Sequence, residues 1–264
     1  MATIVYCHAH PDDEASQTSG TMARAADEGH RVVVVFATNG DLGEVAADAV
    51  EGETVAAYRA REAAASAAAI GLGRVAWLGY ADSGMAGWPQ NDHDGSLHRA
   101  DLDEAAQRLA DLLDEEDADV VIGYDWHGGY GHPDHVKVHH VVRRAAELAA
   151  RRPRLLESTM NRDEMIRLVA MGREAGMEVD DFDPEQPMDD GNPFGSPEDE
   201  ITWRVDVSAF LDRKRASLEA HRSQATDIDM FLSMPAEVFD LFFGHEHLIE
   251  PGDDGPMREG WPFA

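Results

Sequence analysis

The chain has 264 residues, of which 43% are hydrophobic, which is enough to build a large domain around a sizeable core. It carries 52 acidic residues against 22 basic ones, a formal net charge of −30, and such a field repels nucleic acid and anionic membranes. Its single cysteine, Cys7, excludes an internal disulfide and a cysteine-rich zinc site.

No apolar run approaches the roughly 20 residues that a membrane-spanning helix needs. The N-terminus leads directly into an apolar stretch, without the basic and hydrophobic regions of a signal peptide. These features predict a cytoplasmic protein with no membrane or nucleic-acid partner, and they leave formation of a homo-oligomer open.

The first 150 residues alternate between apolar runs and helical patterns. In chain order we expect a strand at Thr3–Cys7, a helix at Glu14–Glu28, a strand at Val32–Thr38, a helix at Thr54–Ile70, a strand at Val75–Leu78, a helix at Asp101–Glu116, a strand at Asp119–Tyr124 and a helix from Pro133 to about Ala150. Strands that alternate with helices of this length indicate βαβ units. The predicted fold is therefore α/β, a Rossmann-like and mostly parallel sheet with helices on both faces.

The pattern after Arg151 is less regular and predicts a C-terminal elaboration. We expect a strand at Leu155–Met160, a helix at Arg162–Ala175, an edge strand at Ile201–Val207, a helix at Ser208–Arg222 and packing of Phe239–Phe243 onto the core. Gly176–Glu200 has ten acidic residues and no basic one, so it is either a mobile lid or an ordered excursion. We expect one domain over residues 1–264, with its core at about 1–160, the acidic excursion at about 176–200 and the additions at 201–264.

Two polar clusters follow apolar runs, each where a strand passes into a helix. They are Ala9-His10-Pro11-Asp12-Asp13-Glu14 and Gly129-Tyr130-Gly131-His132-Pro133-Asp134-His135. Ligands of an open α/β sheet bind at the carboxyl ends of its strands. We therefore expect the two clusters to meet and to hold one catalytic metal ion.

The first cluster offers an imidazole and two carboxylates. His10 and Asp13 are three residues apart on a tight turn, so both can point at one ion above the sheet. A catalytic zinc needs three protein ligands and an open position for water. Asp12 points elsewhere and is the natural base for a proton of metal-bound water. Adjacent acids alone are more often helix caps, but the second cluster favours a metal site.

The second cluster offers His132, Asp134 and His135, and His139 follows one helical turn later. His135 and His139 share a helical face, so on spacing alone both could bind the metal. The more economical arrangement takes His135 as the third ligand and leaves His139 behind it or in the core. As an imidazolium, His132 could stabilise an oxyanion or protonate a leaving amine. Asp134 either sets the tautomer of His132 and raises its pKa, or is only an acid of the first helical turn.

These motifs resemble the LmbE/PIG-L family of zinc-dependent N-acetylglucosaminyl deacetylases, and within it the deacetylases and amidases of mycothiol metabolism. Besides the two clusters, the resemblance rests on Tyr58-Arg59-x-x-Glu62, Trp77-Leu78-Gly79, Asp82-Ser83-Gly84-Met85 and, more weakly, Lys214-x-x-x-Leu218-x-x-His221-x-x-Gln224. The resemblance implies that His10, Asp13 and His135 bind Zn²⁺ and that Asp12 is the general base. Iron(II) is an alternative that the same ligands allow.

The resemblance also implies roles for residues around the metal. His132 corresponds to an acid or electrophile supported by Asp134, and Tyr130 to a tyrosine that polarises the amide carbonyl. Arg59 and Asp82 correspond to positions that contact the sugar. Each has a simpler interpretation, because Tyr130 can pack against its loop, Arg59 can be a solvated helix arginine and Asp82 can form a turn.

The sequence therefore predicts a zinc hydrolase that cleaves the N-acyl, and in particular N-acetyl, amide of a small amino-sugar substrate. An amidase or deacylase of a thiol conjugate or specialised metabolite is the alternative, but the family's amidases carry lysine where this chain has Gln17. A non-catalytic metal-binding or sugar-binding protein is a third interpretation. A nucleotide-binding module is not favoured, because the turn after the first strand is too bulky and acidic to hold phosphates.

Overall fold

The computed structural model describes residues 1–43, 45, 52–174, 182–188 and 190–263. The strands are β1 (Thr3–His8), β2 (Arg31–Thr38), β3 (Arg74–Tyr80), β4 (Val120–Tyr124), β5 (Arg154–Thr159), β6 (Trp203–Asp206), β7 (His245–Ile249) and β8 (Arg258–Glu259). The helices are α1 (Asp13–Gln17), α2 (Ser19–Asp27), α3 (Val55–Ile70), α4 (Leu102–Glu115), α5 (Pro133–Leu148), α6 (Arg162–Glu174), α7 (Leu211–Ala220), α8 (Ala225–Ser233) and α9 (Ala236–Phe243). Short 3-10 turns lie at Pro89–Asp92, Glu198–Glu200 and Ser208–Phe210.

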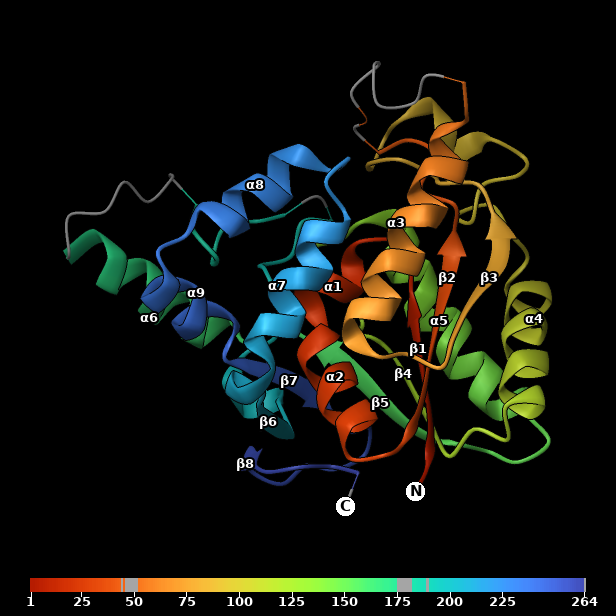
Figure 1. Cartoon of the computed structure of the whole chain (residues 1–264). Helices are drawn as coiled ribbons and strands as arrows, with labels where there is room; N and C mark the ends of the chain where they lie inside the picture. The colour runs from red at the N-terminus through yellow and green to blue at the C-terminus, as the bar shows by residue number, and fades with distance from the viewer. Residues whose placement is uncertain (44, 46–51, 175–181, 189, 264) are drawn as a thin grey trace.

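The strands form one sheet in the order β3-β2-β1-β4-β5-β7-β6-β8 (Figure 1). The first five strands of this order are parallel, and β7 is antiparallel to both β5 and β6. The chain builds outward from β1 through β2 to β3, then returns to the other side of β1 with β4. The strand order reverses between β1 and β4, and such a switch point opens a crevice at the carboxyl ends of the strands.

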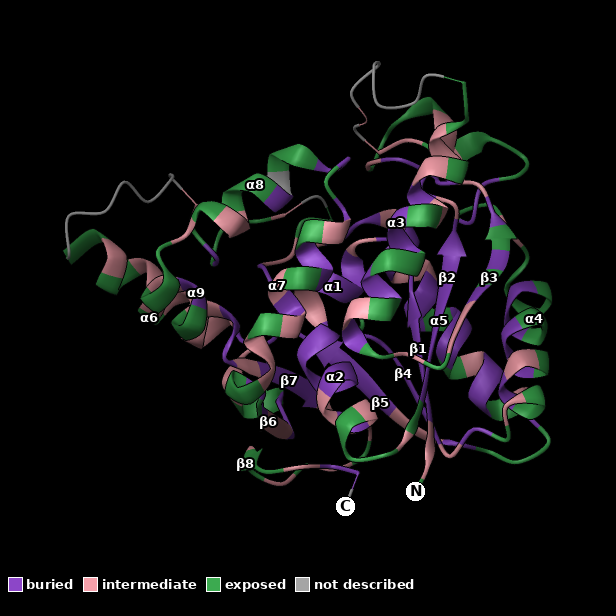
Figure 2. Cartoon of the chain, in the orientation of Figure 1, coloured by how far each residue is buried: buried purple, intermediate pink, exposed green. Residues whose placement is uncertain are grey.

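Helices cover both faces of the sheet, so the expected α/β fold is confirmed. Val5 and Val35 point to the face covered by α4 and α5, where they pack with Leu109 and Val142. The alternating residues of the same strands point to the face covered by α2 and α3, in a cluster that includes Tyr6, Val34, Phe36, Met22 and Ile70. Figure 2 shows these central strands buried and the outer surfaces of the helices exposed.

The C-terminal part extends the sheet and adds a second helical layer. α7 packs on α3, and a third apolar cluster joins α7, α8 and α9 through Leu218, Ile228 and Phe239. The strand expected at Ile201–Val207 is β6, but the prediction that it forms the edge of the sheet is wrong, because β6 pairs with β7 on one side and with the short β8 on the other. None of the described helices combines the length and apolar character needed to cross a bilayer.

Two expected helices are interrupted. The helix expected at Glu14–Glu28 divides at Thr18, whose φ is −134° and whose hydroxyl bonds the His8 ring at 2.7 Å. The helix expected at Ser208–Arg222 begins with a 3-10 turn and continues as α7.

The acidic excursion is only partly within the described residues, because 175–181 and 189 lie outside them. Its later part borders the loop between β4 and α5. The Gly195 N–H donates to the Gly129 carbonyl at 2.6 Å, and Asp190 lies 3.3 Å from the ring of His127. The described later part of the excursion therefore packs beside the second polar cluster.

Candidate metal centre and active site

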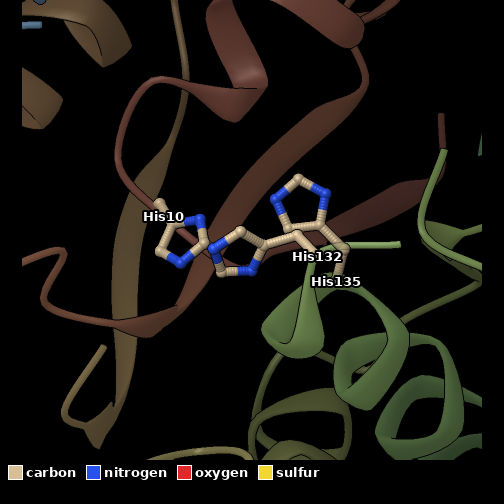
Figure 3. A group of neighbouring side chains, drawn as sticks. All are labelled: His10, His132 and His135. Atoms are coloured by element: carbon tan, nitrogen blue, oxygen red, sulfur yellow. The ribbon is translucent and has the colours of Figure 1, made fainter. Parts of the chain in front are cut away.

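The two polar clusters meet at the switch point of the sheet. β1 and β4 are neighbours, with Tyr6 opposite Ile122, so the loops that follow them lie side by side. Figure 3 shows the rings of His10, His132 and His135 gathered between the loop after β1 and the start of α5. One ring nitrogen of each lies within 4.8 Å of the others, and all three residues are buried.

His135 presents a free lone pair to Asp13. Its Nδ1 is 3.0 Å from the carbonyl of Gly128, and a carbonyl only accepts, so Nδ1 carries the proton. Nε2 then bears the lone pair, is buried and has no hydrogen-bond partner among the described residues. It lies 3.3 Å from Asp13 Oδ1. Two acceptors face each other here, an arrangement that a cation between them stabilises.

His10 is arranged in the same way. Its Nε2 lies 3.3 Å from a carboxylate oxygen of Asp134 and 3.6 Å from one of Asp82, while its Nδ1 lies 3.3 Å from Asp13 Oδ2. Burial alone would lower the pKa of His10, but the facing carboxylates, Asp82 foremost, raise it well above the usual value. Without a metal ion, this favours a ring protonated on both nitrogens; loss of the Nδ1 proton, with the Nε2 proton still directed at Asp134, would leave Nδ1 able to bind a cation beside Asp13.

Asp13 is the carboxylate between the two rings. Its Oδ2 accepts hydrogen bonds from the Tyr124 hydroxyl and the His10 main-chain N–H, both at 2.8 Å. Burial raises its pKa, but His135 and His10 outweigh burial and hold the pKa well below its usual value. Asp13 is thus an anion over the whole physiological pH range.

The donor set and spacing fit a small divalent metal ion. Tetrahedral coordination with bonds of about 2.0 Å separates neighbouring ligand atoms by about 3.3 Å. His10 Nδ1 lies 3.3 Å from Asp13 Oδ2, and His135 Nε2 lies 3.3 Å from Asp13 Oδ1, so each ring nitrogen meets a different oxygen of the carboxylate at this spacing. The groups of three described residues whose ligand atoms lie within 4.8 Å of one another are His10, His132 and His135, and His10, Asp82 and Asp134, so His10 belongs to both.

His132 caps α5 with its side chain. Its Nδ1 accepts the Asp134 main-chain N–H at 3.1 Å, so the neutral ring carries its proton on Nε2. Burial, His10 and His135 lower the pKa of His132 to about 2. The Asp134 carboxylate accepts hydrogen bonds from the main-chain N–H and the hydroxyl of Ser83. It also lies against the ring of His10. This differs from the expected pairing of the Asp134 carboxylate with the His132 ring.

Asp12 adjoins Asp13 and has an unusual backbone conformation, with φ 128° and ψ −28°. Its side chain makes no capping hydrogen bond to α1 within the described residues, so the helix-cap interpretation is not supported. Its carboxylate is 26% exposed and lies 3.1 Å from the guanidinium of Arg59. Burial raises the pKa of Asp12 to about 6, although Arg59 opposes the shift.

The remaining predicted residues lie close by. Arg59 is 2% exposed and donates to the carbonyls of Pro11 and Gly40, so it is not a solvated helix arginine. Asp82 accepts the Gly84 N–H at 2.8 Å and is also the second carboxylate near His10. Tyr130 places its ring 5.0 Å from that of His135.

Tyr124 is a residue of the site that the sequence did not reveal. Its ring stacks on His135, with centroids 4.4 Å apart and planes 2° apart, and its hydroxyl accepts the Ala9 N–H while donating to Asp13. His139 lies behind it, with Nδ1 3.1 Å from the Tyr124 carbonyl. The only sequence signal for Tyr124 was its place at the end of a buried strand, which a core tyrosine shares.

The comparisons with known proteins agree with this architecture. The family model for PIG-L, GlcNAc-PI de-N-acetylase, matches residues 5–146. A 1D-myo-inositol 2-acetamido-2-deoxy-alpha-D-glucopyranoside deacetylase of Acidothermus cellulolyticus is 37% identical, over 100% of this chain and 95% of the relative. A deacetylase of the same name from Thermomonospora curvata is 34% identical, over 96% of this chain and 92% of the relative.

A solved structure shares the fold: N,N'-diacetylchitobiose deacetylase from Pyrococcus horikoshii, with a TM-score of 0.55 and 20% identity, over 90% of this chain and 73% of that chain. The family match and the long alignments at more than 30% identity indicate the same family that the two polar clusters resemble. The chain belongs to the PIG-L family of GlcNAc-PI de-N-acetylases.

Proposed function

We propose that this protein hydrolyses the N-acetyl amide of a small amino-sugar substrate, with a metal ion held by His10, Asp13 and His135. The observation that carries the proposal is the pair of ring nitrogens that face the Asp13 carboxylate at 3.3 Å, each ring with its proton directed away from Asp13. Zn²⁺ is the proposed metal, with Fe²⁺ as the alternative that a His-Asp-His donor set also accepts.

The bound metal would lower the pKa of a coordinated water to about 7 and polarise the amide carbonyl. Asp12 is the proposed general base, because it adjoins the ligands without being one and its pKa of about 6 suits proton transfer near neutrality. Its partly exposed carboxylate accepts the proton of the attacking water and returns it toward the leaving amine.

His132 is the proposed electrophile. Its neutral ring carries a proton on Nε2, because Nδ1 is occupied by the main-chain N–H of Asp134. The Nε2–H of His132 can donate to the oxygen of the substrate amide as negative charge develops on that oxygen. Tyr130, on the same glycine-flanked loop, is the second proposed donor to this oxygen. A preformed donor is worth about 10²- to 10³-fold in kcat.

Arg59, Asp82 and Asp134 are proposed to act by positioning. Each is at least nine-tenths buried and bonds to the protein. Arg59 holds the loop of Asp12, whereas Asp82 and Asp134 orient His10. For Arg59 and Asp82 this differs from the sugar contacts that the sequence predicted.

The substrate class is proposed from the relatives, which are named as deacetylases of N-acetylglucosaminyl-inositol and align over nearly the whole chain. A cytoplasmic location and the absence of nucleic-acid partners remain predictions from composition. The amidase alternative remains as well, and Gln17 is the position to examine, because its side-chain amide lies 3.5 Å from Asp13 Oδ1.

The test is an amine-release assay of the purified protein loaded with Zn²⁺ or Fe²⁺. The substrates are N-acetylglucosaminyl-inositol, simpler N-acetylglucosaminides and an N-acylated cysteine conjugate. We expect the N-acetyl amino sugars to be cleaved fastest and activity to be lost on chelation. Preferred cleavage of the cysteine conjugate would support the amidase, and no amine release from any substrate would overturn the proposal.

A further inference from the structure

The main chain of Asp12 is held in a conformation that residues with a side chain rarely adopt. Its φ of 128° lies in the region that favours glycine, so the backbone is strained at this residue. Such strain persists only where surrounding contacts outweigh it. Two sets of buried contacts hold Asp12, and they come from different parts of the chain.

The first set comes from α3. Arg59 donates to the Pro11 carbonyl, immediately before Asp12, and to the Gly40 carbonyl at 2.7 Å. Its guanidinium also pairs with the Asp12 carboxylate at 3.1 Å. Arg59 thus fixes the peptide before Asp12 and the side chain of Asp12 together.

The second set begins with Glu14. One carboxylate oxygen accepts the Asp12 main-chain N–H at 2.9 Å. The other accepts the Ser66 hydroxyl at 2.6 Å and lies 2.6 Å from His221 Nε2. Glu14 is 1% exposed and His221 is fully buried, so this carboxylate depends on His221 for its opposite charge.

We propose that His221 is a positioning residue for the reaction: through Glu14 it holds the main chain of Asp12, so that the Asp12 carboxylate faces the substrate side of the metal centre. The inference rests on the proposed role of Asp12 as general base. It assigns a catalytic purpose to the C-terminal motif around His221, which lies 207 positions from Glu14 in the chain.

An ion pair on α7, the helix whose C-cap is His221, provides a matched control. Lys214 is also fully buried, and its Nζ lies 2.8 Å from Glu246. Glu246 accepts the N–H groups of Gly20 and Thr21 at the start of α2, and so caps α2. Replacing Lys214 or His221 removes the buried positive partner of a carboxylate. Only the carboxylate that His221 pairs with, Glu14, holds the main-chain N–H of Asp12.

The experiment compares His221→Leu, His221→Gln and Lys214→Met in the metal-loaded full chain. We expect His221→Leu to keep its metal and its KM within about threefold and to lose roughly 10- to 100-fold in kcat, because small displacements of catalytic groups cost about this much. His221→Gln, which keeps a donor near Nε2, should recover most of the loss. Lys214→Met should lose stability but retain kcat within about threefold.

A double-variant cycle with Asp12→Asn decides between positioning and general destabilisation. If His221 acts through Asp12, His221→Leu lowers kcat little further in the Asp12→Asn background. An equal loss in both backgrounds, or an unchanged kcat in an active His221→Leu enzyme, would overturn the inference.

Should His221→Leu fail to fold, Ser66→Ala removes a donor to the same Glu14 oxygen. This variant must then lower kcat in the wild-type background and have little further effect in the Asp12→Asn background. An inactive wild type would overturn the proposed function and the inference with it.

Discussion

At the scale of single residues, Asp13 joins the two halves of the site. Its carboxylate faces one ring from each loop at 3.3 Å, and Tyr124 fixes the orientation of that carboxylate. The ring protons of His10 and His135 are held by Asp134 and Gly128. Orientation by such outer contacts sets which nitrogen of each ring can bind a metal.

Asp12→Asn separates metal binding from proton transfer. The amide has the shape of the carboxylate but cannot accept the proton of the attacking water. We expect kcat to fall by about 10²- to 10⁴-fold while the metal content stays at the wild-type level. Steady-state kinetics with elemental analysis of the same preparation would check this. Loss of the metal in parallel with kcat would mean that Asp12 is itself a ligand.

Tyr124→Phe tests the outer contacts of the site. The ring that stacks on His135 remains, but Asp13 loses one of its donors. We expect metal affinity to fall by about 10- to 100-fold, measured by chelator competition. Tyr80→Phe, a change on β3 whose hydroxyl has no partner among the described residues, is the control and should leave the affinity unchanged. Equal affinities in all three proteins would contradict this account.

The sequence predicted His10, Asp12, Asp13 and His135 as one group because two unusual clusters each followed an apolar run. It could not reveal Tyr124, because a tyrosine at the end of a buried strand has the same pattern whether it is core or functional. The partner of the Asp134 carboxylate was not predictable either. It depends on Ser83, which a loop brings in from the end of β3.

At the scale of elements, the alternating pattern of the first 150 residues predicted the strands and helices to within a few residues. Strands buried on both faces and helices with glycine caps leave clear signals, as at Gly71, whose φ is 91°. The break at Thr18 was missed because its causes are tertiary. They are the contact with His8 and the capping of α2 by Glu246, more than 200 residues away.

Asp101→Ala tests the local stability of α4 apart from the site. The Asp101 side chain caps this helix by accepting the Glu104 N–H at 3.0 Å. We expect the variant to lose about 1 kcal/mol of unfolding free energy, the usual cost of losing such a cap, with kcat unchanged. Urea unfolding followed by circular dichroism would measure it. A changed kcat would show that α4 is coupled to the site, which this account does not predict.

At the scale of the whole molecule, the topology places the chemistry. The reversal of strand order between β1 and β4 is the only arrangement in the described sheet that sets the loops after these two strands side by side. The C-terminal part, from β6 to β8, extends the sheet and contacts the segment after β1 through His221, whose Nε2 lies 2.6 Å from Glu14. Its strand order could not be read from the sequence, because short strands that pair antiparallel give weak patterns.

Buried neutral histidines predict a loss of stability in acid. Burial lowers the pKa values of His8, His139 and His247 to about 4, against 6.5 when they are exposed in the unfolded chain. Between these values the unfolded state binds protons that the folded state does not, so the contribution of each of these three histidines to the unfolding free energy falls as the pH drops below about 6.5.

The effect can be isolated at His247, which lies away from the metal centre and packs against Glu164. Between pH 7.5 and pH 5 we expect the metal-free wild type to lose about 1–2 kcal/mol more unfolding free energy than His247→Gln. Urea titrations at the two pH values give both numbers. An equal drop in the two proteins would mean that His247 is already charged in the folded state.

The convergence of two distant loops on one cation is most directly tested by the metal content of His135→Ala. His139→Ala is the matched control, since His139 lies one turn further along α5 and is buried behind Tyr124. We predict one ion per chain in the wild type and in His139→Ala, and none retained by a folded His135→Ala after dialysis. A folded His135→Ala that still holds one ion per chain would contradict the account.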